Sequence, residues 1–504
     1  MIVLNDFEII FLLSTGLVVL IYFYINENIK HEITPPKLTN NPSWDVIVTE
    51  TTPLLSFFNA KGGSKAKSYQ IQIDRSKKFD SNDKIAYNNV KENGELVSDI
   101  KISEKNALKD KTQYYWRVRA VGANGVKSDW SVSRFYVDIE SDDKFMRLTR
   151  AEIKNIEVSG GYNAKNIIDW DDPGLVTYWQ SPPPGDKKQW VKFDLGKSSL
   201  VSRIWILSNP ADSDGWLKDF WLEKSADGKT WQKVHDSEIK NNDTFRNIID
   251  FKPVRARFFR LMISEFIGYA AQINEIILYS PGTPPVPKVP KDNYVLIIGN
   301  EHNGFTFTDL AKHIESLNLG LKTVTVPYYE ASLEMLEKLP HKPAAIVLSG
   351  NNADYPNLPM FEHNGEFEII RYSSIPILGI CAGHQFLAMA YGYTRARSMG
   401  WSDISAMEPR KEMTHIEIAA NDPIFKGIDD NFIAPEVHSW AVVEPAEEFS
   451  VIARSKYIQA QKSSRRLIYG AQFHGEIHVP YNQGMPYIKN FLNVALNNKN
   501  NQKG

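Results

Sequence analysis

The sequence predicts a multidomain protein: two all-β sandwiches, then an α/β domain with a mostly parallel sheet, with one membrane helix at the amino terminus. Three observations predict this fold class. Apolar and polar residues alternate between about 34 and 280, as in half-buried strands. Beyond residue 292, continuous apolar strands alternate with helical stretches, which is typical of a parallel sheet covered on both faces. An uncharged apolar run precedes all of these elements.

The composition excludes several classes of protein. The chain has 504 residues, 42% hydrophobic and 23% charged, which fits a soluble globular protein of about three domains. The formal net charge of −2 leaves no basic excess, so we expect no nucleic-acid partner. The single cysteine, Cys381, excludes an internal disulfide and a cysteine-based metal cluster. We expect no cofactor and no metal, and any chemistry of Cys381 is that of a nucleophile.

Residues 1–30 are predicted to form a membrane anchor or a signal segment. The run 9–25 holds seventeen uncharged residues, which is short for a membrane span and long for a signal peptide. No small-residue cleavage site follows it, so an uncleaved anchor is favoured over a cleaved signal, and a buried helix is the remaining alternative. The flanking charges weakly favour a cytoplasmic body, whereas the downstream domains favour an extracytoplasmic one. We expect a membrane-anchored, extracytoplasmic protein and leave its orientation open.

The first β-domain is predicted over residues 34–139. Between 114 and 120, apolar side chains alternate with tyrosine and arginine, as in a half-buried strand. The stretch resembles a fibronectin type III domain, with Leu108, Thr112 and Tyr114 where that family places its tyrosine corner. The resemblance implies that the Tyr114 hydroxyl ties the strand to a loop. Since no catalytic set of residues is visible, we interpret the domain as a spacer or an interaction module.

The second β-domain is predicted over residues 145–280. Its marks, in chain order, are Trp170-Asp171-Asp172, Thr177-Tyr178-Trp179-Gln180-Ser181, Gln189-Trp190-Val191-Lys192-Phe193-Asp194-Leu195-Gly196, Ser225-Ala226-Asp227-Gly228, Trp231, Arg257-Phe258-Phe259-Arg260-Leu261 and Asn274-Glu275-Ile276. Together they resemble a discoidin (F5/8 type C) domain, a jelly-roll sandwich. The family's flanking cysteine pair is missing, which fits its bacterial, sugar-binding branch.

The discoidin resemblance implies a glycan ligand, held by loops at one end of the sandwich. An aromatic face stacks on a sugar ring in such sites. Trp216 and Tyr269 are candidates because they lie in loop-like stretches, and Trp170 is a third candidate. The alternative is that all three serve in packing. Trp179 and Trp190 are predicted to lie in the core.

A proline-rich linker is predicted over residues 281–292, because five prolines occur in the eleven positions 281–291. The α/β domain follows over residues 293–498. Its expected strands are 294–299, 321–326, 344–349 and 376–380, and its expected helices are 308–319, 331–339 and 386–391. Binding sites in such sheets lie beyond the carboxyl ends of the strands.

The sole cysteine stands at the end of one of these strands. The segment Gly379-Ile380-Cys381-Ala382-Gly383-His384-Gln385 predicts a strand, a sharp turn and a helix, with the thiol between two glycines. This is the thiol counterpart of a nucleophile elbow, in which glycines relieve crowding around a strained residue. The helix amino terminus favours a thiolate. We therefore predict that Cys381 is a nucleophile rather than a packing residue.

A base and an orienting carboxylate are available in the segment 469–476. His474 can carry the proton, and Glu476 can hold the imidazole and stabilise its charged form. With Val437-His438-Ser439-Trp440 between them, the two motifs resemble the class I (triad) glutamine amidotransferase domain, most like the amidotransferase part of GMP synthetases. The resemblance covers about residues 294–496.

The amidotransferase resemblance implies a reaction and a set of site residues. Cys381 attacks a glutamine side-chain amide to give a thioester and ammonia, with His474 and Glu476 as the other catalytic residues. The resemblance implies an oxyanion hole from Ala382, Gly350 and Asn351. It implies substrate contacts from Gln385, His438 and Ser439.

Three departures from the family pattern leave the substrate open. The oxyanion strand ends in Ser349-Gly350-Asn351-Asn352 rather than Ser-Gly-Gly-Pro, Gly475 replaces a proline, and Trp440 replaces a second histidine. We expect a cysteine-dependent amidohydrolase acting on a small glutamine-like amide, tethered to a surface or glycan by its β-domains. The alternatives are an anchored glycan-binding adhesin with a non-catalytic scaffold, and a γ-glutamyl peptidase.

Overall fold

The computed structural model describes residues 33–501, with gaps at 39–45, 49, 61, 63–66, 94–96, 124, 138, 140–144, 149–151, 170–176, 184, 186–187, 211–212, 302–304, 352–354, 392–395, 399–412, 439, 443–444 and 447. The chain forms two compact units, residues 1–140 and 141–504, which are described separately. The predicted membrane segment 1–30 lies outside the described residues. Among the described residues, no helix is long and apolar enough to cross a membrane.

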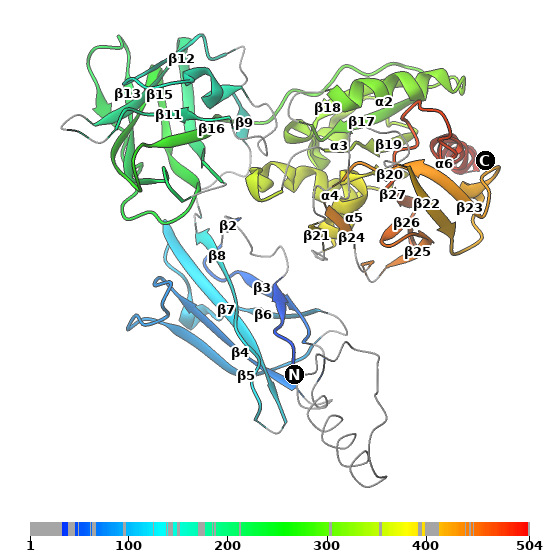
Figure 1. Cartoon of the computed structure of the whole chain (residues 1–504), viewed down its shortest axis with the longest axis horizontal. Coiled ribbons are helices and arrows are strands. Elements are labelled where there is room, and N and C mark those ends of the chain that lie inside the picture. The colour runs from blue at the N-terminus through cyan, green and yellow to red at the C-terminus, as the bar shows by residue number, and fades with distance from the viewer. Residues whose placement is uncertain are drawn as a thin grey trace, which may run out of the picture. The chain divides into compact units, whose positions relative to one another are not determined.

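The first unit is a β-sandwich of a three-stranded and a five-stranded sheet (Figure 1). The smaller sheet has the order β1-β3-β6 and the larger one β2-β8-β7-β4-β5. The strands are β1 (Lys37–Leu38), β2 (Val46–Val48), β3 (Leu54–Phe58), β4 (Lys67–Asp74), β5 (Ile85–Lys91), β6 (Val97–Lys101), β7 (Thr112–Gly122) and β8 (Ser131–Val137). Apolar residues at alternate positions of both sheets fill the space between them.

The tyrosine corner of this unit forms as predicted. The backbone N–H of Lys109 donates to the Tyr114 hydroxyl at 3.0 Å, which ties β7 to the loop before it. On the opposite face of β7, the guanidinium groups of Arg117 and Arg119 lie 4.4 and 4.3 Å from the ring of Trp130. The alternation along β7 thus separates a buried face from a solvated one.

The second unit begins with an eight-stranded antiparallel β-domain. Its strands are β9 (Phe145–Arg147), β10 (Asn155–Val158), β11 (Trp179–Gln180), β12 (Gln189–Ser208), β13 (Leu217–Ser225), β14 (Gln232–Lys233), β15 (Arg246–Phe266) and β16 (Gln272–Pro281). The first strand, β9, pairs with the last, β16, with Arg147 opposite Tyr279.

The two tryptophans predicted to lie in this core differ. Trp179 is fully buried, as predicted. The prediction for Trp190 is wrong, because that side chain is only half-buried. Along β12 the buried side chains are those of Gln189, Val191 and Phe193, so the alternation of the strand turns Trp190 outward.

The α/β domain is built on a nine-stranded sheet of order β18-β17-β19-β20-β27-β26-β25-β22-β23. The first five strands in this order are parallel and the remainder are antiparallel. The strands are β17 (Tyr294–Gly299), β18 (Lys322–Pro327), β19 (Ala345–Leu348), β20 (Ile377–Ile380), β22 (Met413–Ile418), β23 (Asn431–Pro435), β25 (Phe449–Arg454), β26 (Ile458–Ser463) and β27 (Ile468–Ala471). A separate pair joins β21 (Ala396–Ser398) to β24 (Trp440–Val442).

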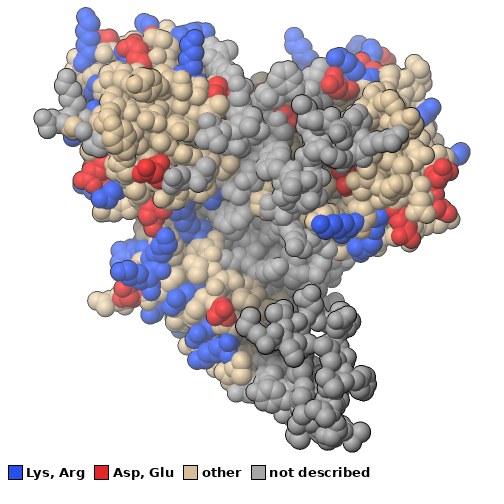
Figure 2. Space-filling view, viewed as in Figure 1, with Lys and Arg blue, Asp and Glu red and all other residues tan. Residues whose placement is uncertain are grey.

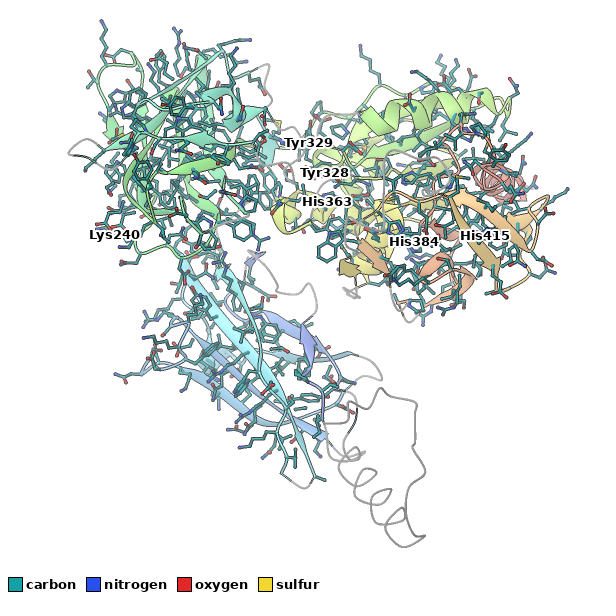
Figure 3. The ribbon with its side chains drawn as sticks, in the orientation of Figure 1. Lys240, Tyr328, Tyr329, His363, His384 and His415 are labelled. Carbon is teal, nitrogen blue, oxygen red and sulfur yellow. The ribbon has the colours of Figure 1, made fainter. Side chains whose placement is uncertain are left out.

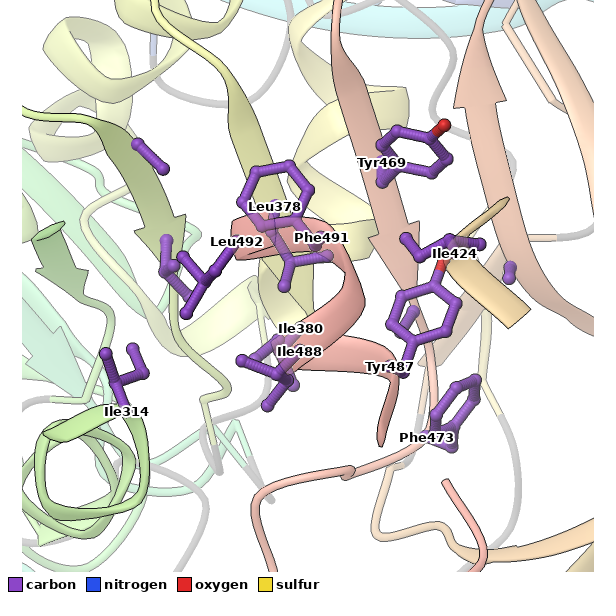
Figure 4. Packing of buried hydrophobic residues seen from close by; sticks show 14 of the residues in the cluster. Ile314, Leu378, Ile380, Ile424, Tyr469, Phe473, Tyr487, Ile488, Phe491 and Leu492 are labelled. Carbon is purple, nitrogen blue, oxygen red and sulfur yellow. The ribbon is translucent and has the colours of Figure 1, made fainter. Parts of the chain in front are cut away.

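The helices of this domain are α2 (Phe305–Ser316), α3 (Leu333–Lys338), α4 (Asn364–Tyr372), α5 (Ala382–Ala390) and α6 (Pro486–Asn501), and the short 3₁₀ helices η3 (Tyr328–Glu330) and η5 (Met360–His363) matter below. The side chains of β20 and α6 pack together in one buried cluster, which includes Ile380 and Phe491 (Figure 4). On the face shown in Figure 2, basic and acidic side chains are interspersed over the described residues of this unit. The parallel strands end where Cys381 begins the turn into α5.

Candidate active site

Cys381 occupies a strained turn between β20 and α5. Its backbone has φ 51° and ψ −104°, which is costly for a residue with a Cβ atom. A 2.7 Å hydrogen bond from the Cys381 N–H to the Ala471 carbonyl holds this conformation. A Cβ at Gly379 would lie 2.4 Å from the Gly383 carbonyl oxygen, and one at Gly383 would lie 2.5 Å from that of Leu348. Both glycines are therefore required by close backbone approach.

His474 and Glu476 come together beside this turn. Nδ1 of His474 lies 2.7 Å from Oε1 of Glu476, and both side chains are at most 10% exposed. Burial alone would lower the pKa of His474, but the charge of Glu476 and an interaction with Cys381 raise it well above its ordinary value. The carboxylate of Glu476 therefore favours the protonated form of the His474 imidazole.

The three predicted oxyanion residues lie in two segments, at the start of α5 and just after β19. Ala382 is the first residue of α5, a position whose amide has no acceptor within the helix. A Cβ at Gly350 would lie 3.3 Å from Cε1 of His474 and 3.6 Å from Cβ of Cys381, so Gly350 packs directly on this pair. Asn351 follows it and is half-buried. The N–H of Gly383 donates to the Ser349 carbonyl at 3.1 Å, which joins the strand end to the turn.

The predicted substrate residues have different surroundings. Gln385 is 3% exposed, and its amide bonds to the Tyr355 hydroxyl, the Trp440 carbonyl and, at 3.1 Å, the Gln472 side chain. His438 is buried, and its Nδ1 lies 2.9 Å from the Trp440 carbonyl. Ser439 lies outside the described residues.

Two residues at the site have no role in the sequence prediction. Nε2 of Gln472 lies 3.7 Å from the sulfur of Cys381, and the Val437 carbonyl lies 3.5 Å from it. Gln472 stands within the segment 469–476, two residues before His474, and the alternation of an extended segment is the one signal that places both on the same side. Val437 contributes only a backbone atom, which no side-chain pattern reveals.

The remaining histidines near the site have other partners. His384 is fully buried, and burial together with the charge of His438 lowers its pKa to about 3, so its imidazole is neutral. Nδ1 of His313 lies 2.9 Å from Nε2 of His478. Across the part of the chain that the structure describes, no three His, Cys, Asp or Glu side chains are arranged to hold a metal ion.

The aromatic residues predicted to bind a glycan differ in how much of each side chain is exposed to solvent. Trp170 lies outside the described residues. Trp216 is half-buried, its indole N–H donates to the Asn209 carbonyl at 2.8 Å, and its ring lies 5.7 Å from that of Phe245. Tyr269 is 65% exposed, as a stacking platform requires. Tyr162, which is 73% exposed, is a further surface aromatic that the sequence prediction did not name.

A parallel sheet, a thiol elbow and an adjacent His–Glu pair define a class of enzyme domain, the class-I glutamine amidotransferases. The chain belongs to this family. The glutamine amidotransferase class-I family model matches residues 305–495. The chain is similar to a glutamine-hydrolysing GMP synthase subunit of Saccharolobus solfataricus, with 33% identity over 34% of this chain and 89% of that protein. It is also similar to the corresponding GMP synthase subunit of Pyrococcus abyssi, with 33% identity over 30% of this chain and 76% of that protein.

The β-domains match families of their own. The F5/8 type C domain model matches residues 152–276, and the model of the Rha78A-like N-terminal immunoglobulin domain matches residues 39–137. The immunoglobulin and fibronectin type III domains share a sandwich architecture. A CBM32 module of Clostridium perfringens, solved with GalNAc-β-1,3-galactose, is 20% identical with a TM-score of 0.24 over 26% of this chain and 99% of that one. The chain thus joins a class-I amidotransferase domain to an F5/8 type C, discoidin-type domain.

Proposed function

We propose that the α/β domain is a cysteine-dependent amidohydrolase that acts on a glutamine-like side-chain amide. The observation that carries the proposal is the position of Cys381 on a left-handed turn beside His474, which is itself held by Glu476. His474 can take the thiol proton and so supply the thiolate, which is the attacking form of a cysteine.

The proposed reaction has two halves that use the same residues. The sulfur of Cys381 attacks the amide carbon, and the N–H of Ala382 and the amides at 350 and 351 stabilise the oxyanion. The C–N bond then breaks as His474 gives its proton to the departing ammonia, which leaves a thioester. His474 next takes a proton from water, whose oxygen attacks the thioester and releases the carboxylic acid and the Cys381 thiolate, which restores the starting state.

The discoidin-type domain supplies the second part of the proposal, which is tethering to a glycan. Tyr269 is the candidate contact because its ring is exposed, whereas the ring and N–H of Trp216 are engaged in packing. We further propose that the protein is anchored at a membrane and faces outward. Protease accessibility of intact cells tests that location, and protection of the α/β domain from added protease would contradict it.

A glutamine-mimicking electrophile, combined with measurement of ammonia release, tests the enzyme. We expect the electrophile to label Cys381 and glutamine to release ammonia, and we expect Cys381→Ala to lose both. Cys381→Ser, which keeps a weak nucleophile of similar size, is the matched control for folding. If the parent neither reacts nor hydrolyses any amide in a broad panel, the domain is a scaffold and the glycan-binding adhesin is the better interpretation.

A panel of amides also distinguishes the third candidate. A γ-glutamyl peptidase would cleave γ-glutamyl dipeptides faster than free glutamine through the same thioester, because only the leaving group differs. Faster release of ammonia from glutamine than of amino acid from γ-glutamyl dipeptides supports the amidohydrolase.

A further inference from the structure

A buried carboxylate of the α/β domain is held by side chains of the discoidin-type domain. Glu362, on η5, accepts hydrogen bonds from the Tyr279 hydroxyl at 2.6 Å and the Tyr328 hydroxyl at 2.9 Å. Nη1 of Arg147 lies 3.4 Å from the same carboxylate, and the side chains of Arg147 and Glu362 are 1% and 0% exposed. Arg147 and Tyr279 belong to β9 and β16, so two of the three partners come from the discoidin-type domain.

Arg147, Tyr279 and Tyr328 keep their protons when buried. Burial alone would lower the pKa of Arg147, but the charge of Glu362 raises it above its ordinary value. Burial, reinforced by the charge of Glu362, also raises the pKa of Tyr279 and of Tyr328 well above 10. Both phenols are therefore hydrogen-bond donors at any physiological pH. A buried carboxylate that loses such partners is left with a desolvation penalty that nothing offsets.

The residue after Glu362 continues the chain of contacts toward the thiol. Tyr328 and His363 are neighbours in the α/β domain (Figure 3), and their rings stack at 4.1 Å. The ring of His363 also lies 4.6 Å from that of Phe386 in α5. Nδ1 of His363 lies 2.9 Å from Oε2 of Glu366, on α4. His363 and Glu366 are completely buried, so this pair has no contact with solvent.

Glu366 then fixes the strand that ends at the oxyanion residues. Its Oε1 accepts from the Asn300 side chain at 3.1 Å, and that amide also donates to the Ser349 carbonyl at 3.0 Å. The N–H of Asn300 donates to the Ser349 hydroxyl at 2.8 Å. The same Ser349 carbonyl accepts the N–H of Gly383 in the elbow, and Ser349 precedes Gly350.

We propose that Arg147 and Tyr279 are positioning residues for the thiol site, which act through Glu362, His363, Glu366 and Asn300 to hold the Ser349–Gly350 strand end against the Cys381 elbow. The discoidin-type domain then supports the structure of the active site, in addition to its proposed role of tethering the protein to a glycan. An oxyanion hole is sensitive to such placement, since its donors must lie at hydrogen-bond distance from the oxyanion.

Hydrogen exchange in the full-length protein tests the coupling without any substrate. Tyr279→Phe removes one hydrogen bond to Glu362 with little change of shape, and Arg147→Met removes the charge. Arg260→Met is the matched control, because Arg260 pairs with Glu223 inside the discoidin-type domain. We expect the amides at 349–351 and 382–385 to exchange at least fivefold faster in the first two variants and unchanged in the control. Unchanged exchange in folded Tyr279→Phe would overturn the proposal.

Kinetics give a second readout, which rests on the proposed amidohydrolase. Alkylation by iodoacetamide needs the thiolate but no oxyanion hole, whereas turnover of an amide needs both. We expect Tyr279→Phe to lower kcat at least fivefold and to leave KM and the alkylation rate within twofold of the parent. Parallel loss of turnover and alkylation, or an equal loss in Arg260→Met, would show general destabilisation instead. A parent without turnover would refute the proposed function alone, because hydrogen exchange still decides the coupling.

Discussion

Cys381 shows how strictly a functional residue constrains its neighbours. Its left-handed backbone places the sulfur at the head of α5, and this conformation requires backbone to approach backbone at Gly379 and Gly383. Any side chain at Gly379 would meet a carbonyl oxygen of α5 and any at Gly383 a carbonyl oxygen of β19, neither of which can move without displacing its element. The elbow that holds the nucleophile therefore depends on both glycines, although neither carries a reactive group.

Gly350 offers a test of the space around the imidazole. In Gly350→Ala the new Cβ would lie 3.3 Å from His474 Cε1, so the ring must shift by a few tenths of an ångström. We expect amide turnover to fall by roughly tenfold or more, since small misplacements of reacting groups are costly. Gly185→Ala is the control, because no atom lies within 4 Å of its added Cβ. Full turnover in Gly350→Ala would show that the imidazole tolerates the contact.

His384 predicts an acid-sensitive fold. Burial, with the charge of His438, lowers its pKa to about 3, whereas an unfolded histidine titrates near 6.5. Between these values the unfolded state binds more protons, so the free energy of unfolding falls as the pH falls through this window. The slope from this residue alone is at most about 1.4 kcal/mol per pH unit.

Urea unfolding at pH 7 and pH 5 measures this slope. We expect the loss of stability to be smaller in His384→Gln than in the parent. His341→Gln is the matched control, because His341 lies on the surface. An equal loss of stability in the parent and His384→Gln would assign the acid sensitivity to other groups.

At the scale of single elements, β7 carries a prediction for the amino-terminal sandwich. Tyr114→Phe removes the acceptor for the Lys109 N–H, which is worth about 1 kcal/mol. We expect the amides of β7 to exchange about fivefold faster in native-state hydrogen exchange. Tyr115→Phe, next to it on the more solvated face, is expected to leave exchange unchanged. Equally faster exchange in the two variants would show that the tyrosine corner is not what protects the amides of β7.

Elements could be predicted wherever their signal is local. The elbow is local, because strand, glycines, cysteine and helix occupy one short segment, and β17, β19 and β20 each lie within the apolar run that predicts them. The two tryptophans show the limit: one residue of register decides whether Trp190 faces the core or the solvent. Asn300, Glu362 and Glu366 could not be assigned, because their partners lie far away in sequence and become neighbours only through the sheet order.

At the scale of the whole molecule, we expect glycan binding and amide hydrolysis to be affected by different substitutions. Tyr269→Ala removes an exposed ring, so we expect glycan binding to weaken about tenfold or more with unchanged ammonia release. Trp216→Ala removes a packed ring with an engaged N–H, so we expect a lower melting temperature as well. Glycan arrays, ammonia release and thermal unfolding measure the three quantities. Unchanged glycan binding in Tyr269→Ala would move the site elsewhere on the domain.

The pairing of β9 with β16 has a consequence for how such a chain can arise. Phe145 lies opposite Pro281, so the polypeptide enters and leaves the discoidin-type domain at one place, about 5 Å apart. A gene segment for this domain can therefore be gained or lost by one recombination event, without rerouting the rest of the chain. The same event brings or removes Arg147 and Tyr279, so recombination would alter the surroundings of a carboxylate in the next domain. The discoidin-type domain is topologically easy to exchange, yet in this protein it makes a buried hydrogen bond and a buried ion pair to the α/β domain.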